Sequence, residues 1–140
     1  MTKCISIHSP GQGLLEITPQ VQAVVREART KEGLCTIFVQ HTSASLLIQE
    51  NADPSAKRDL EQWLNRLVKE DDPLYSHTAE GPDDMPSHIK SAITATSLPI
   101  PILNGQLALG TWRESIFGNI ATTAARGRLS STLVAEGSGT

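Results

Sequence analysis

The sequence predicts an α+β fold, with about three helices and a β-sheet of mixed or antiparallel strands. Two observations predict it. Strand-like and helical segments are interspersed without a regular alternation, and the C-terminal part contains a strong hairpin signal at Asn104-Gly105. This dipeptide supplies the two positive-φ positions of a type I′ turn, so the segments on either side should pair as antiparallel strands.

The expected strands are short segments rich in apolar or β-branched residues. The first two flank a PGQG turn, and we expect them to form a hairpin. Pro99 and Pro101 cannot donate hydrogen bonds to a ladder, so their strand should be an edge strand or irregular. The expected strands are residues 3–8, 14–17, 34–40, 45–48, 97–103, 106–112 and 128–135.

Three segments have helical periodicity. Thr18 and Asp53 are expected N-caps, each followed by a proline at the first helical position, and Asp84 is expected to cap the third helix with Pro86 in its first turn. The apolar residues expected to face the core are Val21, Val24, Val25 and Ala28 in the first helix, Leu60, Trp63, Leu64 and Leu67 in the second, and Ile89, Ala92 and Ile93 in the third.

The composition is that of a cytoplasmic globular protein. The 140 residues predict one domain over residues 1–136, with a flexible tail over residues 137–140. The net charge of −3 argues against nucleic acid or an anionic membrane as a partner. No stretch reaches the roughly 18 apolar residues of a membrane span. Cys4 and Cys35 lie in strand-like segments, where we expect small buried thiols.

Two polar clusters follow strands in the first half of the chain. His41, in HTSAS, comes directly after the expected strand 34–40, where a side chain is well held and yet open to a ligand. A histidine that only hydrogen-bonds a neighbouring loop would suit the same position. In ENADP, an Asx turn at Asn51 and a helix cap at Asp53 explain every polar residue except Glu50.

The segment SHTAEGPDDMPSH, residues 76–88, has a richer set of candidates. Asp84 and His88 are four residues apart and should share one helix face, while His77 and Glu80 lie in the preceding loop. Imidazole and carboxylate groups are ordinary ligands of a divalent metal such as zinc. A capped and solvated helix start would explain the carboxylates as well, but it does not require the histidines.

Three of the four histidines in the chain belong to these clusters. If the fold brings His41, His77 and His88 together, they form a three-ligand site with room for water or substrate, which is the usual form of a catalytic zinc site. No HExxH-type pattern fixes the geometry in advance.

The segment NGQLALGTW, followed by Arg113, is a further candidate. Gly110 lies inside the expected strand, where glycine marks a bulge or a close approach of the backbone, and Arg113 is a suitable donor to phosphate. An anion pocket and a bulge beside a core Trp112 explain the segment equally well. P-loop, Rossmann and α/β-hydrolase motifs are absent from the sequence.

Four blocks of the sequence closely resemble the YjbQ family of small bacterial and archaeal proteins, also called the secondary thiamine-phosphate synthase family. They are HTSASLLIQENADP, RDLEQWLNRLV, EGPDDMPSHIK and NGQLALGTW, in the family's order, and the resemblance extends over residues 5–136. It implies an α+β fold with a layered sheet, assembled as a homotrimer, and a polar pocket between subunits that binds a divalent metal, zinc or magnesium.

The resemblance also implies site residues at matching positions. The implied metal ligands are His41, His77, Asp84 and His88. The implied catalytic residues are His41, Glu80 and His88. The implied substrate-binding residues are Thr42, Ser43, Asn51 and Arg113.

The sequence departs from the family pattern after Trp112. Family members usually have glutamine where Arg113 stands, and many then carry an aromatic-rich stretch ending in Glu-His-Arg, whereas this chain has ESIFGNIATTAARGR. Glu114 and either Arg126 or Arg128 could replace the missing residues in part.

Three functions remain open at this point. The resemblance implies an enzyme that joins a pyrimidine diphosphate to a thiazole phosphate and releases diphosphate. The departures after Trp112 favour instead a non-catalytic trimer that binds a metal or a small anion. A purely structural protein would have no convergent histidines.

Overall fold

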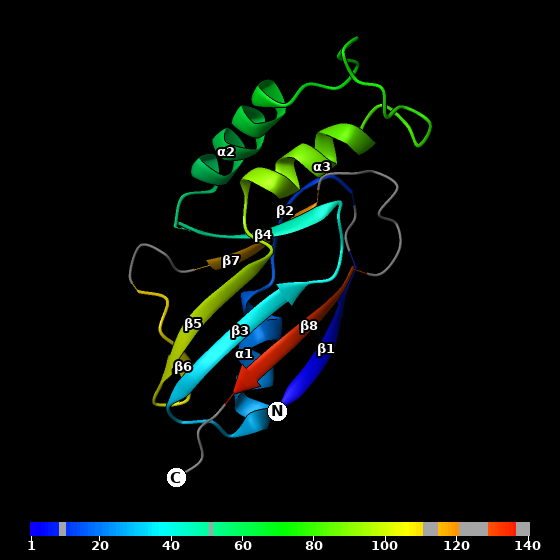
Figure 1. Ribbon diagram of the computed structural model, residues 1–140. Coiled ribbons are helices and arrows are strands. Elements are labelled where there is room, and N and C mark those ends of the chain that lie inside the picture. The colour runs from blue at the N-terminus through cyan, green and yellow to red at the C-terminus, as the bar shows by residue number, and fades with distance from the viewer. Residues whose placement is uncertain (9–10, 51, 111–114, 121–128, 137–140) are drawn as a thin grey trace.

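In the part of the chain that the structure describes, the strands form two antiparallel sheets, and three helices pack against them (Figure 1). The computed structural model describes residues 1–8, 11–50, 52–110, 115–120 and 129–136. Within these ranges the larger sheet has the order β1 (Thr2–Ile7), β8 (Leu129–Glu136), β3 (Gly33–Val39), β5 (Ser97–Leu103) and β6 (Gln106–Leu107). The smaller sheet has the order β2 (Gly13–Glu16), β7 (Ser115–Ile120) and β4 (Ala44–Gln49). The predicted α+β class with antiparallel strands is confirmed.

The helices occupy two places in the molecule. Helix α1 (Thr18–Ala28) lies behind the larger sheet in Figure 1 and buries Val21, Val24 and Val25 in the main core, as the sequence predicts. Helices α2 (Pro54–Leu67) and α3 (Asp84–Ile93) lie together beyond the smaller sheet, where α2 contacts β2 and α3 contacts β4. On the opposite face of the larger sheet, the described part of the chain places no helix.

The expected hairpin of the first two strands is wrong. β1 pairs with β8 in the larger sheet, and β2 pairs with β7 in the smaller one. The sequence did not predict β7, which lies between β2 and β4 and supplies the buried Ile116 and Phe117. Because the partners of these strands are distant in sequence, a local turn signal between β1 and β2 does not determine their pairing.

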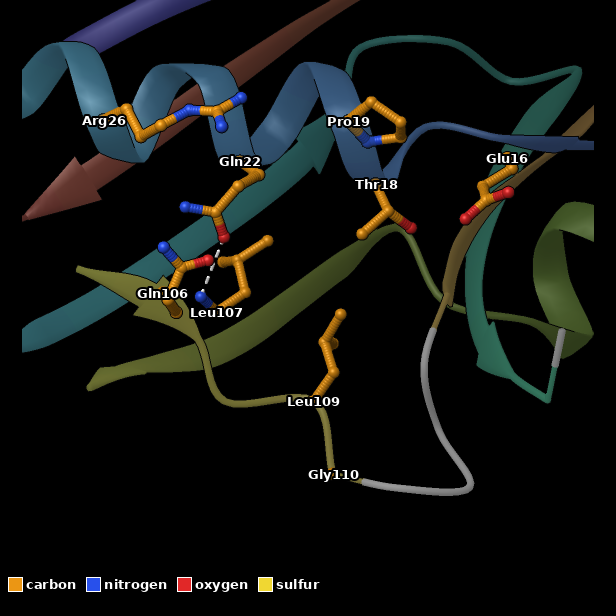
Figure 2. Close-up of a pocket in the computed structure, with 9 residues that line it drawn as sticks. All are labelled: Glu16, Thr18, Pro19, Gln22, Arg26, Gln106, Leu107, Leu109 and Gly110. Carbon is orange, nitrogen blue, oxygen red and sulfur yellow. Dashed lines mark hydrogen bonds between the residues drawn. The ribbon is translucent and has the colours of Figure 1, made fainter. Parts of the chain in front are cut away.

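The Asn104-Gly105 turn is confirmed, since both residues have positive φ, 52° and 77°. Its second strand is much shorter than expected: β6 ends at Leu107, so Gly110, with φ of 79°, lies outside a strand. The side chain of Gln22 holds the turn. Its Nε2 donates to the Gly105 carbonyl at 3.0 Å. Its Oε1 accepts from the Leu107 N–H at 3.0 Å, as the dashed line in Figure 2 marks.

Helix starts differ from the expectation in two of three cases. Asp53 caps α2 as predicted, with Oδ1 accepting from the Ser55 N–H at 2.9 Å. Thr18 is instead the first residue of α1, and its hydroxyl accepts from the Ile116 N–H at 2.8 Å, which joins the helix to β7. Helix α3 begins at Asp84, so its N-cap position belongs to Asp83.

The apolar faces of α2 and α3 are only partly buried. On α2, Leu64 is buried, whereas Trp63 and Leu67 are half-exposed. On α3 the expected inward face is wrong, because Ala92 and Ile93 are exposed. The residues that α3 buries are Asp84, Pro86, Ser87 and Lys90.

The two cysteines have different surroundings. Cys35 is fully buried in the core, as expected, but Cys4 is exposed, and neither forms a disulfide. No helix in the described part of the chain is long and apolar enough to cross a membrane. The expected tail at residues 137–140 lies outside the described residues.

Candidate metal centre

Three predicted ligands meet at the N-terminal end of α3. The Nε2 atom of His77 lies 2.7 Å from Oδ2 of Asp84, and the Nε2 atom of His88 lies 3.1 Å from the same oxygen. The two imidazole rings have centroids 5.3 Å apart. One potential ligand atom from each of the three residues lies within 4.8 Å of the others, so all could contact one ion. We call these three residues the His-Asp-His cluster.

Local structure explains why these residues meet. Asp84 and His88 are one turn apart on α3, and therefore share a helix face. His77 reaches them because the preceding loop turns back at Gly81, which has φ of 112°, a conformation that side chains strongly disfavour. The Gly81 N–H donates to the Thr78 carbonyl at 3.3 Å and closes this turn.

Burial differs among the three side chains. Asp84 is nearly buried, with 12% of its side chain exposed, whereas the side chains of His77 and His88 are 47% and 32% exposed. The carboxylate therefore lies at the base of the cluster and the imidazoles line its open side. A ligand can approach from solvent, which a catalytic metal site requires and a closed structural site does not.

Electrostatics keep Asp84 ionised. Burial raises the pKa of this carboxyl, but the hydrogen bond with His77 and the positive charges of His88 and His77 when protonated outweigh it, so the pKa lies below its ordinary value. A ligand carboxylate must be deprotonated to bind a metal, and the neighbouring histidines favour that state.

The donor set fits a divalent transition metal. Two imidazole nitrogens and one carboxylate oxygen are usual zinc ligands, and tetrahedral ligands about 2.0–2.1 Å from zinc lie about 3.3–3.4 Å from each other. The two distances to Asp84 Oδ2 are shorter than this, so binding requires each imidazole to move outward by a few tenths of an ångström. Because both histidines are partly exposed, such a movement meets little resistance.

Glu80 and His41 lie differently from the cluster. The Oε2 atom of Glu80 is 3.8 Å from His77 Nε2, and its side chain is 69% exposed, so it can only assist at the rim. His41 is exposed and is not part of the cluster in the single chain, where the third donor is Asp84. Its Nδ1 accepts from the Ser43 N–H at 2.9 Å, which leaves the proton of the neutral ring on Nε2.

The predicted substrate-binding residues are described only in part. Thr42 is exposed and Ser43 is buried, next to His41. Asn51 and Arg113 lie outside the described residues, as do Trp112, Glu114, Arg126 and Arg128.

Sequence reasoning missed the contact that fixes α3 against α2. Lys90, only 3% exposed, donates from Nζ to Oδ1 of Asn65 on α2 at 2.7 Å. Desolvation lowers the pKa of Lys90, although Glu70 and Asp83 act in the opposite direction. No sequence signal identified it, because a lysine on a helix is normally expected at the surface.

A cavity of about 490 Å³ lies beside α1 (Figure 2), and it shares no lining residue with the cluster. Among the described residues that line it, the charged ones are Glu16 and Arg26. They lie on either side of Gln22, which already hydrogen-bonds the Gly105–Leu107 turn. None of the predicted site residues that the structure describes lines this cavity.

Fold and cluster together define a small α+β protein with a candidate divalent-metal centre. Comparison with known proteins agrees with this fold. A family model described as UPF0047 protein YjbQ-like matches residues 3–134. The chain belongs to the YjbQ family.

Individual relatives support the assignment. The UPF0047 protein sll1880 of Synechocystis is 54% identical over 107 residues, which are 76% of this chain and 73% of that protein. The UPF0047 protein YjbQ of Escherichia coli O157:H7 is 36% identical over 135 residues, 96% of this chain and 97% of that protein.

Solved structures share the fold. A member of the yjbq/upf0047 family from Clostridium acetobutylicum has a TM-score of 0.81 and 28% identity, with 97% of this chain and 99% of that chain covered. A YbjQ-like protein of unknown function from Sulfolobus solfataricus has a TM-score of 0.85 over 98% of this chain and 96% of that chain, at 22% identity.

Proposed function

We propose that the protein binds a divalent metal at the His-Asp-His cluster and uses it in a reaction of a small phosphorylated molecule. The observation that carries this proposal is the meeting of His77 and His88 at one oxygen of Asp84. Two imidazole donors favour zinc over magnesium, which prefers oxygen ligands and retains several waters.

The reaction that we propose resembles that of thiamine-phosphate synthase, which joins a pyrimidine diphosphate to a thiazole phosphate and releases diphosphate. A metal at the cluster would supply a Lewis acid that stabilises the departing diphosphate. Asp84 orients both imidazoles through its shared oxygen, and Glu80 can orient His77 from the rim. His41, with its Nε2 proton directed away from the Ser43 contact, is suited to donate to a phosphate oxygen.

We also propose that the protein acts as a homotrimer in the cytoplasm, with the pocket between subunits. In support, the face of the larger sheet opposite α1 exposes Leu34, Phe38 and Leu103, at 43%, 43% and 55%. Their register on β3 and β5 places them on the same face. Exposed apolar patches of this kind mark interaction surfaces. Assembly would also allow His41 of one chain to approach the cluster of another.

A second candidate is a metal-binding trimer without catalytic activity. The separation of His41 from the cluster in the single chain favours it, because a lone cluster can hold a metal without a complete reaction site. The lack of any familiar diphosphate-binding motif in the sequence favours it too.

Metal analysis together with a turnover assay distinguishes the two candidate functions. The purified protein would be stripped with a chelator, reloaded with zinc or magnesium, and assayed for thiamine phosphate formation from its two precursors. We expect one metal per chain, its loss in His88→Ala, and product formation that depends on the metal. If the protein binds metal but forms no product even at high protein concentration, only the non-catalytic trimer remains as a candidate. If His88→Ala keeps the metal content of the wild type, the cluster is not the metal site under either candidate function.

A further inference from the structure

A second cavity lies between α2 and the smaller sheet. It has a volume of about 430 Å³, within the range of small-molecule pockets. It shares no lining residue with the His-Asp-His cluster. Its lining residues are Leu14, Gln49, Glu50, Ala56, Lys57, Asp59, Leu60, Trp63 and Phe117.

The cavity combines an apolar lining with an exposed aromatic side chain, Trp63. Leu14, Leu60 and the buried Phe117 provide the apolar surface. Trp63 is 50% exposed although it lies on a helix that packs on the sheet, and no hydrogen bond joins its indole N–H to another of the described residues. Its ring is therefore available to a ligand.

The charges around the cavity are mainly negative. Neither Glu50 nor Asp59 forms a hydrogen bond or ion pair with another residue in the described ranges. Among the described residues that line the cavity, Lys57 is the one cation, and its Nζ lies 3.8 Å from Oε1 of Glu61, a carboxylate outside the lining. Glu50 was also the residue of ENADP that had no structural explanation in the sequence. An anionic ligand would thus meet two uncompensated carboxylates.

We propose that this cavity binds a small organic cation, such as a quaternary ammonium ion. The face of tryptophan attracts a cation within about 6 Å of the ring through its quadrupole. The carboxylates of Glu50 and Asp59 compensate the charge, while the apolar surface receives the alkyl groups. This site does not depend on the proposed metal centre or on its reaction.

The test compares a cation with a neutral molecule of the same shape. Choline and 3,3-dimethylbutan-1-ol would be titrated by calorimetry into the full chain, with a chelator present to exclude the metal centre. We expect saturable binding of choline and at least about tenfold weaker binding of the alcohol, since only the cation can use the tryptophan face and the carboxylates. A second measurement follows the fluorescence of Trp63 in Trp112→Phe, because the chain contains only two tryptophans.

Variants assign the binding to this cavity. Trp63→Leu and Glu50→Gln should each weaken choline binding by at least about threefold, and Glu32→Gln, an exposed carboxylate before β3, should leave it unchanged. Circular dichroism would confirm that each variant is folded. Absence of saturable choline binding, equal binding of the alcohol, or unchanged affinity in both Trp63→Leu and Glu50→Gln would overturn the proposal.

Discussion

Asp84 links the two histidines of the cluster through one carboxylate oxygen. We expect Asp84→Asn to reduce zinc affinity by at least about tenfold, because the amide is neutral and a poorer ligand than the carboxylate that both imidazoles contact. Calorimetric titration with zinc measures this change. Glu32→Gln, which removes an exposed carboxylate before β3 and outside the cluster, is the control and should bind zinc like the wild type. Equal zinc affinities in the wild type and both variants would argue against the cluster as the zinc site.

Cys35 gives a prediction for alkaline pH. Burial raises the pKa of its thiol from 9.0 to about 11, so the folded protein keeps the thiol protonated after the unfolded chain has begun to ionise. The free energy of unfolding should therefore fall as pH rises from about 9 to about 11. Denaturant unfolding of the wild type and Cys35→Ala over this range measures the effect, and the variant should show a smaller fall. A fall of the same size in both would show that Cys35 does not contribute.

The contact between α2 and α3 positions the helix that carries two of the three cluster residues. Asn65→Ala should lower the free energy of unfolding by about 1–3 kcal/mol, because it leaves the buried ammonium of Lys90 without its acceptor. In the Lys90→Met background, Asn65→Ala should lower the free energy of unfolding by much less, since the buried charge of Lys90 is then absent. Urea unfolding of the four proteins of this double-mutant cycle measures the coupling, and equal losses in both backgrounds would contradict it.

Sequence patterns predicted individual turns, caps and helix faces better than they predicted which strands pair. The Asn104-Gly105 turn, the Asp53 cap and the core face of α1 follow from local chemistry, and all three were correct. Strand pairing depends on contacts distant in sequence, so the partners of β1 and β2 and the existence of β7 could not be read locally.

In the candidate site, too, sequence predicted local contacts but not contacts between distant parts of the chain. Asp84 and His88 lie on one helix, so their proximity was predictable from a spacing of four, and His77 lies in the loop that leads into that helix. Whether His41 joins them depends on the arrangement of separate elements, and in the single chain it does not. The inward face of α3 was mispredicted because this helix buries Lys90 and Ser87 against its neighbours rather than Ala92 and Ile93.

At the scale of the whole molecule, one face of the larger sheet exposes Leu34, Phe38 and Leu103, and no helix of the described residues covers it. If this face forms the proposed trimer interface, Phe38→Glu should convert the trimer to monomers, because burying an unpaired carboxylate there is costly. Light scattering after size-exclusion chromatography measures the mass. Lys31→Glu, an exposed charge change in the turn before β3, should remain trimeric. A monomeric wild type would refute the assembly, and a trimeric Phe38→Glu would place the interface elsewhere.

The arrangement of the molecule leaves the cluster open to solvent at the end where α2 and α3 pack together. The central claim is that a divalent metal binds at this cluster. Anomalous diffraction from zinc-soaked crystals at the zinc absorption edge tests this claim most directly. We predict a peak about 2.0–2.2 Å from His77 Nε2, Asp84 Oδ2 and His88 Nε2. A peak bound by other residues, or no peak at the cluster in crystals that hold zinc elsewhere, would contradict the account.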